Sequence, residues 1–541
     1  MNDIPELRHA VDRVVVNGGR VFGWGWAAHR SKTVKSVHFR FEGDGWKRRL
    51  PAGIGLARDD VEKAYPDYVN SGASGFVVAG HLPKGATRRS WLEIELDEGP
   101  PARIDVTSLV DSRFSGQRRY RLIAWVASAI WRRLKRGDIL GIIQRAKAQR
   151  YAVPSMSDVA VLDQVANELR GAAAVCVLFD HNMGGGANQY RRKVIADRLA
   201  AGQTVLLCTY NLPILEYRLH LLRAGRDEQV FGISTFLVLE RIIEEGSVTE
   251  LFVNSPVSFD EPLLLAEWLA RMREEHPRVR LTMTAHDYLS VCRSFVLLNA
   301  EGRYCGIPEI STCSSCLKRH EASYVALSPP SDIGPWRALW GRCLHAADEV
   351  RCFSESTRQH LLRAYPTLAR ERLTVVPHKP DYAPARLPRT RPGEPLVVGV
   401  MGEISLQKGA LIVKEILQMI ERSNASVRVV VLGTLHAPIK SSRLEVTGAY
   451  DRADLVDLVE SHGINMFLFP SIWPETFSYV VAEIIALGMP IVAFDLGAPA
   501  ERLRGYAKAR VCGETSASAA LATLIAFHRD LAMGHAQSTS T

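Results

Sequence analysis

The chain has 541 residues, of which 47% are hydrophobic and 23% charged, and its formal net charge is +9. These fractions are typical of globular proteins and argue against a disordered, a collagen-like or a small disulfide-stabilised chain. No run of about 18 apolar residues occurs, and the first residues lack the apolar core of a signal peptide, so we expect no spanning helix and a cytoplasmic location. The nine cysteines are then expected to be reduced or metal-bound.

Residues 1–110 are predicted to form a small β-sandwich, because short runs of strand-forming residues are separated by glycine and proline. The pair Asp44-Gly45 is a good hairpin turn between two of these runs. Nothing in the region has a catalytic spacing. We therefore interpret it as an accessory or docking domain.

Residues 111–170 are predicted to be a basic helical linker. From residue 113 to residue 150 there are eleven basic residues and one acid, Asp138, so this segment carries +10 and the rest of the chain is nearly neutral. Such local charge argues against nucleic acid as a partner. Apolar residues recur at helical spacing and basic ones fall on the opposite face: Ile123, Val126, Ile130 and Leu134 against Arg121, Arg132, Lys135 and Arg136. The pattern fits a helix on an anionic membrane surface, and equally a helix that docks on a neighbouring domain.

Residues 171–390 and 391–541 are each predicted to form a Rossmann-like α/β domain, because apolar runs of strand length alternate with helical segments. The run 172–179 is continuous, as expected of a strand buried on both faces. The second domain begins with the run 396–400, after a proline-rich joint over 377–395. Two such domains enclose a cleft, and their ligands bind beyond the carboxyl ends of the strands.

Two motifs follow predicted strands of the first α/β domain. Gly184, Gly185 and Gly186 would let backbone N–H groups approach an anion at a helix start, although a glycine-rich turn is also a simple connection. His286 and Asp287 follow the strand predicted to end at residue 284, which places them at the cleft. A single histidine is more often structural, so the position is what makes His286 a candidate.

The second α/β domain carries the strongest motif. Glu475 and Glu483 are eight residues apart, which places both near one face of a helix predicted over 476–487, with Glu475 at its start. Lys408 and Gly409 lie earlier, at the start of another predicted helix. One carboxylate could accept hydrogen bonds from sugar hydroxyls and the other from a ribose, while Lys408 and N-terminal amides could hold a diphosphate. The pattern predicts a nucleotide-sugar site.

With these elements, roughly residues 172–530 resemble the retaining family 4 glycosyltransferases of the GT-B fold. The run 486–493 also looks like that family. The resemblance implies that Glu475 contacts the transferred sugar, Glu483 the ribose and Lys408 the diphosphate. The other residues that it places at the donor or the reaction centre are Gly184, Gly185, Gly186, His286, Asp287, Gly402, Gly409, Tyr450, Thr476, Phe477 and Ser478.

The sequence departs from the family pattern at two of its positions. Glu403 stands where many members carry an arginine, and Ser478 stands where a glycine is common. Because a carboxylate repels a diphosphate, either another cation substitutes or the leaving group is stabilised less.

The resemblance implies transfer of a sugar from a nucleotide-sugar donor to a glycan with retention of anomeric configuration. The sequence has no Asp-x-Asp motif, so we expect transfer without a metal ion. The basic helix favours a lipid-linked acceptor, such as a bacterial O-antigen, capsule or exopolysaccharide, and attachment to the inner face of the cell membrane. Two alternatives stay open: a nucleotide-sugar epimerase of the same fold, and a non-catalytic sugar-nucleotide-binding subunit.

Four cysteines gather in a predicted insertion, residues 288–320, of the first α/β domain. They are Cys292, Cys305, Cys313 and Cys316, and the last two form a Cys-x2-Cys pair. Four thiolates in one loop are a reasonable set of ligands for structural zinc. Their spacing is irregular, so reduced cysteines that simply pack in the interior are an equal alternative.

Overall fold

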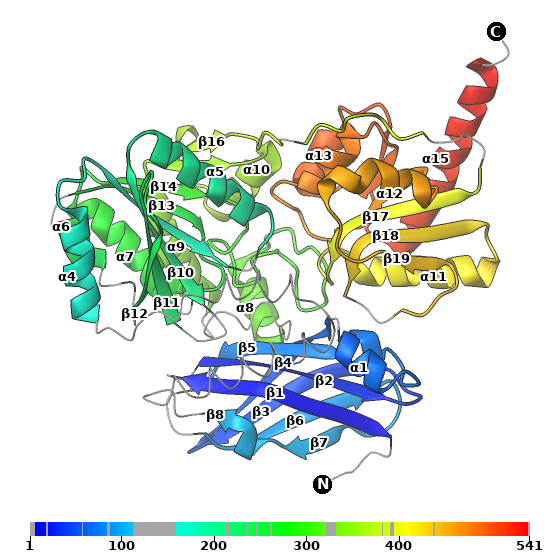
Figure 1. Ribbon diagram of the computed structural model, residues 1–541, viewed down its shortest axis with the longest axis horizontal. Helices are drawn as coiled ribbons and strands as arrows, with labels where there is room; N and C mark the ends of the chain where they lie inside the picture. The colour runs from blue at the N-terminus through cyan, green and yellow to red at the C-terminus, as the bar shows by residue number, and fades with distance from the viewer. Residues whose placement is uncertain are drawn as a thin grey trace.

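The computed structural model describes residues 6–538 apart from 18–19, 57, 84–86, 112–157, 183, 212–215, 234–235, 237–238, 245–246, 260–261, 321–331, 381, 390–393 and 437–438. An N-terminal β domain lies beneath two α/β units that stand side by side (Figure 1). The predicted basic segment 113–150 lies outside the described residues. No helix within the described ranges combines the length and the apolar character needed to cross a membrane.

The N-terminal domain is one continuous eight-stranded sheet, whereas the sequence predicts a small sandwich. Its elements are β1 (Leu7–Asn17), β2 (Arg20–His29), β3 (Val34–Gly43), β4 (Trp46–Leu56), α1 (Asp59–Ala64), β5 (Gly75–His81), β6 (Thr87–Leu96), β7 (Ala102–Asp105) and β8 (Val110–Asp111). The strand order is β7-β6-β3-β4-β5-β2-β1-β8. Strand β2 contacts β3 although β4 and β5 lie between them in the sheet. The sheet therefore curves over itself and encloses Phe39, Phe41 and Phe76.

The first α/β unit has a second eight-stranded sheet, in the order β12-β11-β10-β9-β13-β14-β15-β16. Its elements are α4 (Asp158–Leu169), β9 (Val175–His181), α5 (Gly186–Ala200), β10 (Thr204–Asn211), β11 (Glu216–Leu222), β12 (Gln229–Ile233), α6 (Leu239–Glu244), β13 (Val248–Ser255), α7 (Pro262–Glu275), β14 (Arg280–Thr284), α8 (Ile310–Arg319), α9 (Ile333–Ala346), β15 (Glu349–Cys352), α10 (Glu355–Ala364) and β16 (Leu373–Val375). Every residue of β9 is buried, and β9 pairs in parallel with β10 and β13. This confirms the strand predicted from the apolar run.

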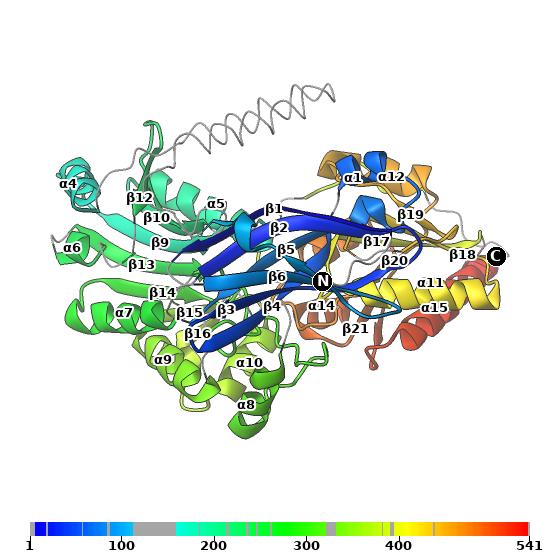
Figure 2. The ribbon, with the colours of Figure 1, turned by 90° about the horizontal axis from the view of Figure 1, so that it is seen from below.

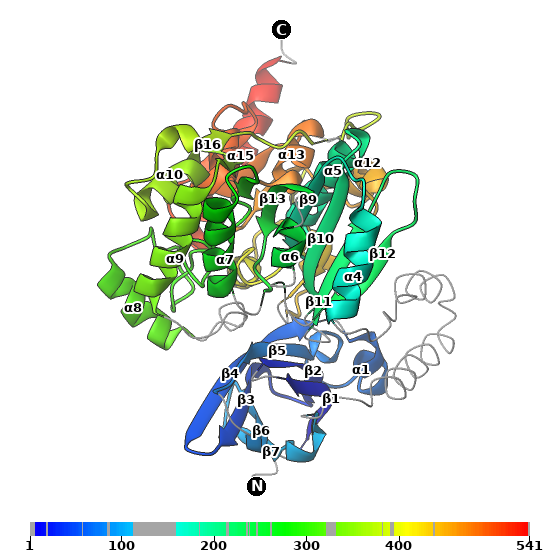
Figure 3. The same cartoon turned by 90° about the vertical axis from the view of Figure 1, so that its left-hand side faces the viewer.

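Helix α4 belongs to this unit, although the sequence-based boundary places its residues in the linker. Its apolar residues Val161, Val165 and Leu169 pack in the same core as β9. Figure 3 shows α4 on the outer surface of the unit, above the N-terminal sheet.

The second α/β unit is a six-stranded sheet whose neighbouring strands all pair in parallel, in the order β19-β18-β17-β20-β21-β22. Its elements are β17 (Leu396–Ile404), α11 (Ala410–Ser423), β18 (Val427–Leu435), β19 (Leu444–Val446), α12 (Leu455–Ser461), β20 (Met466–Phe469), α13 (Tyr479–Ala486), β21 (Ile491–Phe494), α14 (Gly497–Leu503), β22 (Ala509–Cys512) and α15 (Ala517–Ser538). This is the Rossmann order, and it reverses between β17 and β20, where such sheets bind ligands.

The N-terminal sheet lies under both α/β units, as the view from below shows (Figure 2). Gly55 of β4 comes so close to the second unit that a Cβ added there would be 3.0 Å from the backbone of His436. The side chain of Arg293, in the first unit, is nearly buried. Burial and the charge of Arg48 in the N-terminal domain lower the pKa of Arg293 to about 10. The N-terminal domain therefore meets both units.

Candidate active site

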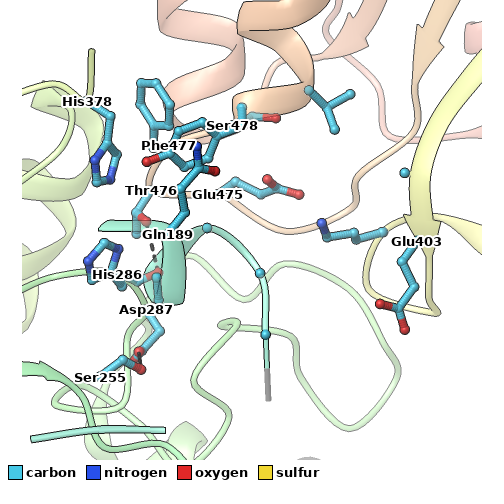
Figure 4. Close-up of a pocket in the computed structure, with 18 of the residues that line it drawn as sticks. Gln189, Ser255, His286, Asp287, His378, Glu403, Glu475, Thr476, Phe477 and Ser478 are labelled. Atoms are coloured by element: carbon cyan, nitrogen blue, oxygen red, sulfur yellow. Dashed lines mark hydrogen bonds between the residues drawn. The ribbon is translucent and has the colours of Figure 1, made fainter. Parts of the chain in front are cut away.

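A cleft of about 870 Å³ lies between the two α/β units and is lined by residues of both. Most of the predicted site residues line it: Gly184, Gly185, Gly186, His286, Asp287, Gly402, Lys408, Tyr450, Glu475, Thr476, Phe477, Ser478 and Glu483. Gly409 and the four cysteines do not. Residues from loops almost 300 positions apart in the sequence are thus brought together (Figure 4).

Glu475 is the most enclosed carboxylate among the predicted donor contacts. Only 5% of the residue is exposed, and its Oε1 accepts a hydrogen bond of 2.9 Å from Ser471 Oγ. Burial raises the pKa of Glu475, while the charge of Lys408 opposes that rise. A carboxylate held this way has a fixed direction and can accept hydrogen bonds from a polar ligand in the cleft.

The predicted helix that carries both acids is shorter than the pattern indicates. Helix α13 begins at Tyr479, because Ser478 is its N-cap and accepts a hydrogen bond of 3.3 Å from the amide of Val481. Glu483 therefore lies in the helix, whereas Glu475 lies in the preceding loop. The expectation that both acids share one helical face is wrong, although both line the cleft.

Two hydrogen bonds fasten the Glu475 loop to the first α/β unit. Thr476 Oγ1 donates to the carbonyl of His286 at 2.9 Å, and Tyr288 OH donates to the carbonyl of Pro474 at 2.9 Å. These bonds flank Glu475 on both sides along the chain. They set the position of its carboxylate relative to the opposite wall of the cleft.

His286 is a neutral, half-buried ring in that opposite wall. It stacks on Phe353, with ring centroids 4.4 Å apart. Its Nε2 lies 3.0 Å from Asn254 Oδ1, and Asn254 Nδ2 donates to the carbonyl of Ala187, so this network assigns the proton to Nε2. Burial, followed by the charge of His378, lowers the pKa of His286 well below its usual value. The ring therefore keeps Nδ1 as a hydrogen-bond acceptor.

The side chain of Asp287 has different hydrogen-bond partners from the side chain of His286. Ser255 Oγ donates to Asp287 Oδ2 at 2.6 Å, and the amide of Leu289 donates to Oδ1 at 2.8 Å. Burial raises the pKa of Asp287 to about 6 in spite of these two bonds. Asp287 thus holds the loop that presents His286, and in the described structure no hydrogen bond joins the two side chains.

The glycine-rich turn leads into α5 at the edge of the cleft. Gly184 and Gly185 have φ angles of 85° and 83°, a region that residues with a side chain rarely adopt. The amide of Gly184 donates to Asn188 Oδ1 at 2.7 Å, and Asn188 in turn donates to the buried Asp180. A Cβ on Gly186 would be 3.0 Å from the ring of Tyr479. The first turn of α5 therefore touches the first residue of α13 across the cleft.

The predicted ribose contact, Glu483, is paired with an arginine that the sequence analysis does not single out. Arg452 Nε lies 2.7 Å from Glu483 Oε1, and the guanidinium lies over the ring of Tyr382. Tyr450 lines the same end of the cleft. Arg452 precedes Glu483 by 31 positions and lies in a different segment, so no local spacing could indicate the pair.

The Lys-Gly element lies on the far side of the cleft from His286. Gly409 has a φ of 88°, and a Cβ there would be 2.0 Å from the carbonyl oxygen of Pro470. Glu403 turns outward: its side chain is 69% exposed and lies 3.2 Å from His436 Nε2 (Figure 4). The Glu403 carboxylate therefore has a partner outside the centre of the cleft, and Lys408 is the cation beside Glu475.

An aromatic wall formed by His378, Phe353 and Phe477 completes the site, and of these three only Phe477 is predicted from the sequence. His378 stacks on Phe353 at 4.0 Å and meets Phe477 edge-on at 4.6 Å. Burial and the charge of Lys193 lower the pKa of His378 to about 3. His378 lies in the segment that joins the two units, so its part in the site depends on the fold rather than on any motif.

Three of the four cysteines belong to, or pack against, the apolar core of the first unit. Cys313 belongs to the core of the first unit, and Cys292 and Cys305 pack against it. Burial raises the pKa of the Cys292 thiol to about 12. Among the residues that the structure describes, no three His, Cys, Asp or Glu side chains are grouped closely enough to hold a metal ion. A zinc site stays a prediction from the sequence.

Part of this chain matches a known protein family. Residues 385–533 match the sequence model of the family described as glycosyl transferases group 1. No curated protein matches the chain by sequence.

Three similar solved structures share a low sequence identity with this chain. One is a lipopolysaccharide outer core galactosyltransferase, at 11% identity and a TM-score of 0.41, covering 66% of this chain and 91% of that one. A sucrose-phosphate synthase from Thermosynechococcus elongatus has 15% identity, a TM-score of 0.41 and the same coverage. The Anabaena protein HepE in complex with UDP has 15% identity and a TM-score of 0.40, covering 68% and 99%. By the family match over its second α/β unit, the protein is a nucleotide-sugar-dependent glycosyltransferase.

Proposed function

We propose that this enzyme transfers a sugar from a nucleotide-sugar donor to a glycan acceptor with retention of anomeric configuration. The observation that carries the proposal is the cleft itself, in which Glu475, Glu483 and Lys408 of one unit face His286 of the other. Glu475 would accept hydrogen bonds from the transferred sugar, and Glu483, oriented by Arg452, from the ribose. The acceptor would enter beside His286 and the aromatic wall.

The diphosphate would lie where helix starts converge. The first turns of α5 and α13 touch at Gly186 and Tyr479, and α11 begins at Ala410 beside Lys408. Helix N-termini present amides and a partial positive charge to an anion. Together with Lys408 they would stabilise the departing diphosphate, so we propose transfer without a metal ion.

A thermal-shift screen of nucleotide sugars and free nucleoside diphosphates tests the donor part. At a ligand concentration 100 times the Kd, binding to the native state adds about 2.7 kcal/mol of stability. We expect one nucleotide series to raise the melting temperature by several degrees. The stabilising donor is then incubated with glycan acceptors, and the anomeric configuration of the product is read by NMR. The absence of a shift with every nucleotide would contradict the proposal.

We further propose a lipid-linked bacterial surface glycan as acceptor and attachment to the inner face of the cell membrane. The support is the charge of +10 between residues 113 and 150, because each basic residue near an anionic surface contributes about 1 kcal/mol. Flotation of the protein with vesicles of phosphatidylglycerol is expected to carry it upward. Replacing Arg132, Arg133, Lys135 and Arg136 by glutamine is expected to release it, and equal flotation of this variant would contradict the proposal.

A further inference from the structure

We propose that Arg192 of α5, across the cleft from Lys408, binds the terminal phosphate of the nucleoside diphosphate portion of the donor. The inference rests on the proposed function, since it adds a contact to the same donor. Arg192 belongs to the first α/β unit. The charged residues already proposed to contact the donor, Glu475, Glu483 and Lys408, belong to the second.

The charges in the cleft carry the first part of the argument. Three cations line it, namely Arg192, Lys408 and Arg452. Arg452 pairs with Glu483 at 2.7 Å, and the charge of Lys408 acts on Glu475. Arg192 is exposed and, within the described part of the chain, has neither an ion-pair nor a hydrogen-bond partner.

The other carboxylates that line the cleft have partners of their own and do not neutralise the charge of Arg192. Glu403 turns to His436, and Asp287 is held by Ser255 and the amide of Leu289. A cation without a protein partner in a ligand cleft attracts an anionic group. The anion that a nucleotide-sugar donor supplies is its diphosphate.

The geometry of α5 carries the second part. Gly186, Gln189 and Arg192 all line the cleft and recur every three residues, so they form one face of the helix. Gly186 touches Tyr479, where α5 and α13 begin. Side chains of a helix lean toward its N-terminus, so Arg192 leans back toward this junction. An arginine there can bind a phosphate by donating two parallel N–H hydrogen bonds.

The test compares two glutamine variants that each remove one positive charge. Arg192→Gln removes the cleft donor, and Arg226→Gln removes an exposed charge of the same unit that does not line the cleft. Calorimetry measures the binding of a nucleoside diphosphate and of the monophosphate of the same nucleoside, from the series that stabilises the wild type. Because Arg192 is exposed and unpaired in the described structure, we expect both variants to melt at the wild-type temperature without ligand.

We expect Arg192→Gln to weaken the diphosphate about tenfold or more and the monophosphate less than twofold, because a hydrogen bond between charged groups is lost. Arg226→Gln is expected to change the affinity for either nucleotide by less than twofold, and Arg192→Lys is expected to restore part of the loss. Unchanged diphosphate binding in Arg192→Gln, or equal losses for both nucleotides or both variants, would overturn the inference. A wild type that binds no nucleotide would instead contradict the proposed function.

Discussion

Glu475→Gln is expected to lower kcat for sugar transfer about 100-fold while the protein stays folded. The amide keeps the shape of the side chain and can still accept the hydrogen bond from Ser471, but it loses the negative charge. Hydrogen bonds to a charged group contribute up to about 3 kcal/mol, and such a bond to the transferred sugar would be lost. Steady-state kinetics with the donor found by the thermal-shift screen measure the effect.

The same variant is expected to be at least as stable as the wild type, although it is less active. Because burial raises the pKa of Glu475 above its ordinary 4.5, the folded protein binds the proton more tightly than the unfolded chain. The contribution of Glu475 to the free energy of unfolding is therefore highest below pH 4.5 and falls as the pH rises through the raised pKa. At pH 7–8 the glutamine variant is expected to melt at or above the wild-type temperature.

A matched control tests whether the loss of kcat is specific to a carboxylate in the cleft, by removing a carboxylate elsewhere in the same unit. Glu445 lies on β19, is half-exposed and pairs with Arg428 at 3.9 Å. Glu445→Gln is expected to leave kcat within twofold of the wild type, because exposed ion pairs contribute little. If Glu475→Gln retained full kcat, the Glu475 carboxylate would not contact the transferred sugar.

Gly409→Ala is expected to destabilise the second α/β unit by about 3–4 kcal/mol. The φ of 88° alone costs a residue with a side chain about 1–2 kcal/mol. The new Cβ would also lie 2.0 Å from the carbonyl oxygen of Pro470, so the chain between β20 and Glu475 must shift. We expect a lower calorimetric transition temperature and weaker donor binding in the same variant.

Gly202→Ala isolates the contribution of the backbone angle. Gly202 has a φ of 74° and no atom within 4 Å of an added Cβ, so only the conformational cost of about 1–2 kcal/mol is expected. A Gly409→Ala protein that is no less stable than Gly202→Ala would mean that the Pro470 loop moves freely. The close approach would then not fix the position of Glu475.

The sequence predicts the central strands of both α/β units, because strands buried on both faces are continuous apolar runs. The runs 172–179 and 396–400 overlap β9 and β17, although β9 begins at Val175 and β17 extends to Ile404. It also identifies Glu475, Glu483, Lys408 and His286, which all line one cleft. Glu483 lies in a predicted helix, and the other three lie at the ends of predicted elements, at the edge where parallel sheets bind ligands, so their positions follow from local patterns.

The sequence by itself thus determined the strand-and-helix alternation and the acids, lysine and histidine at the edge of each sheet. Only the tertiary structure decided that Arg452 pairs with Glu483, that Asp287 bonds Ser255, that His378 joins the aromatic wall and that the N-terminal strands form one sheet. The physical reason is that periodicity and caps act within a few residues, whereas these contacts join segments that meet only when whole elements pack.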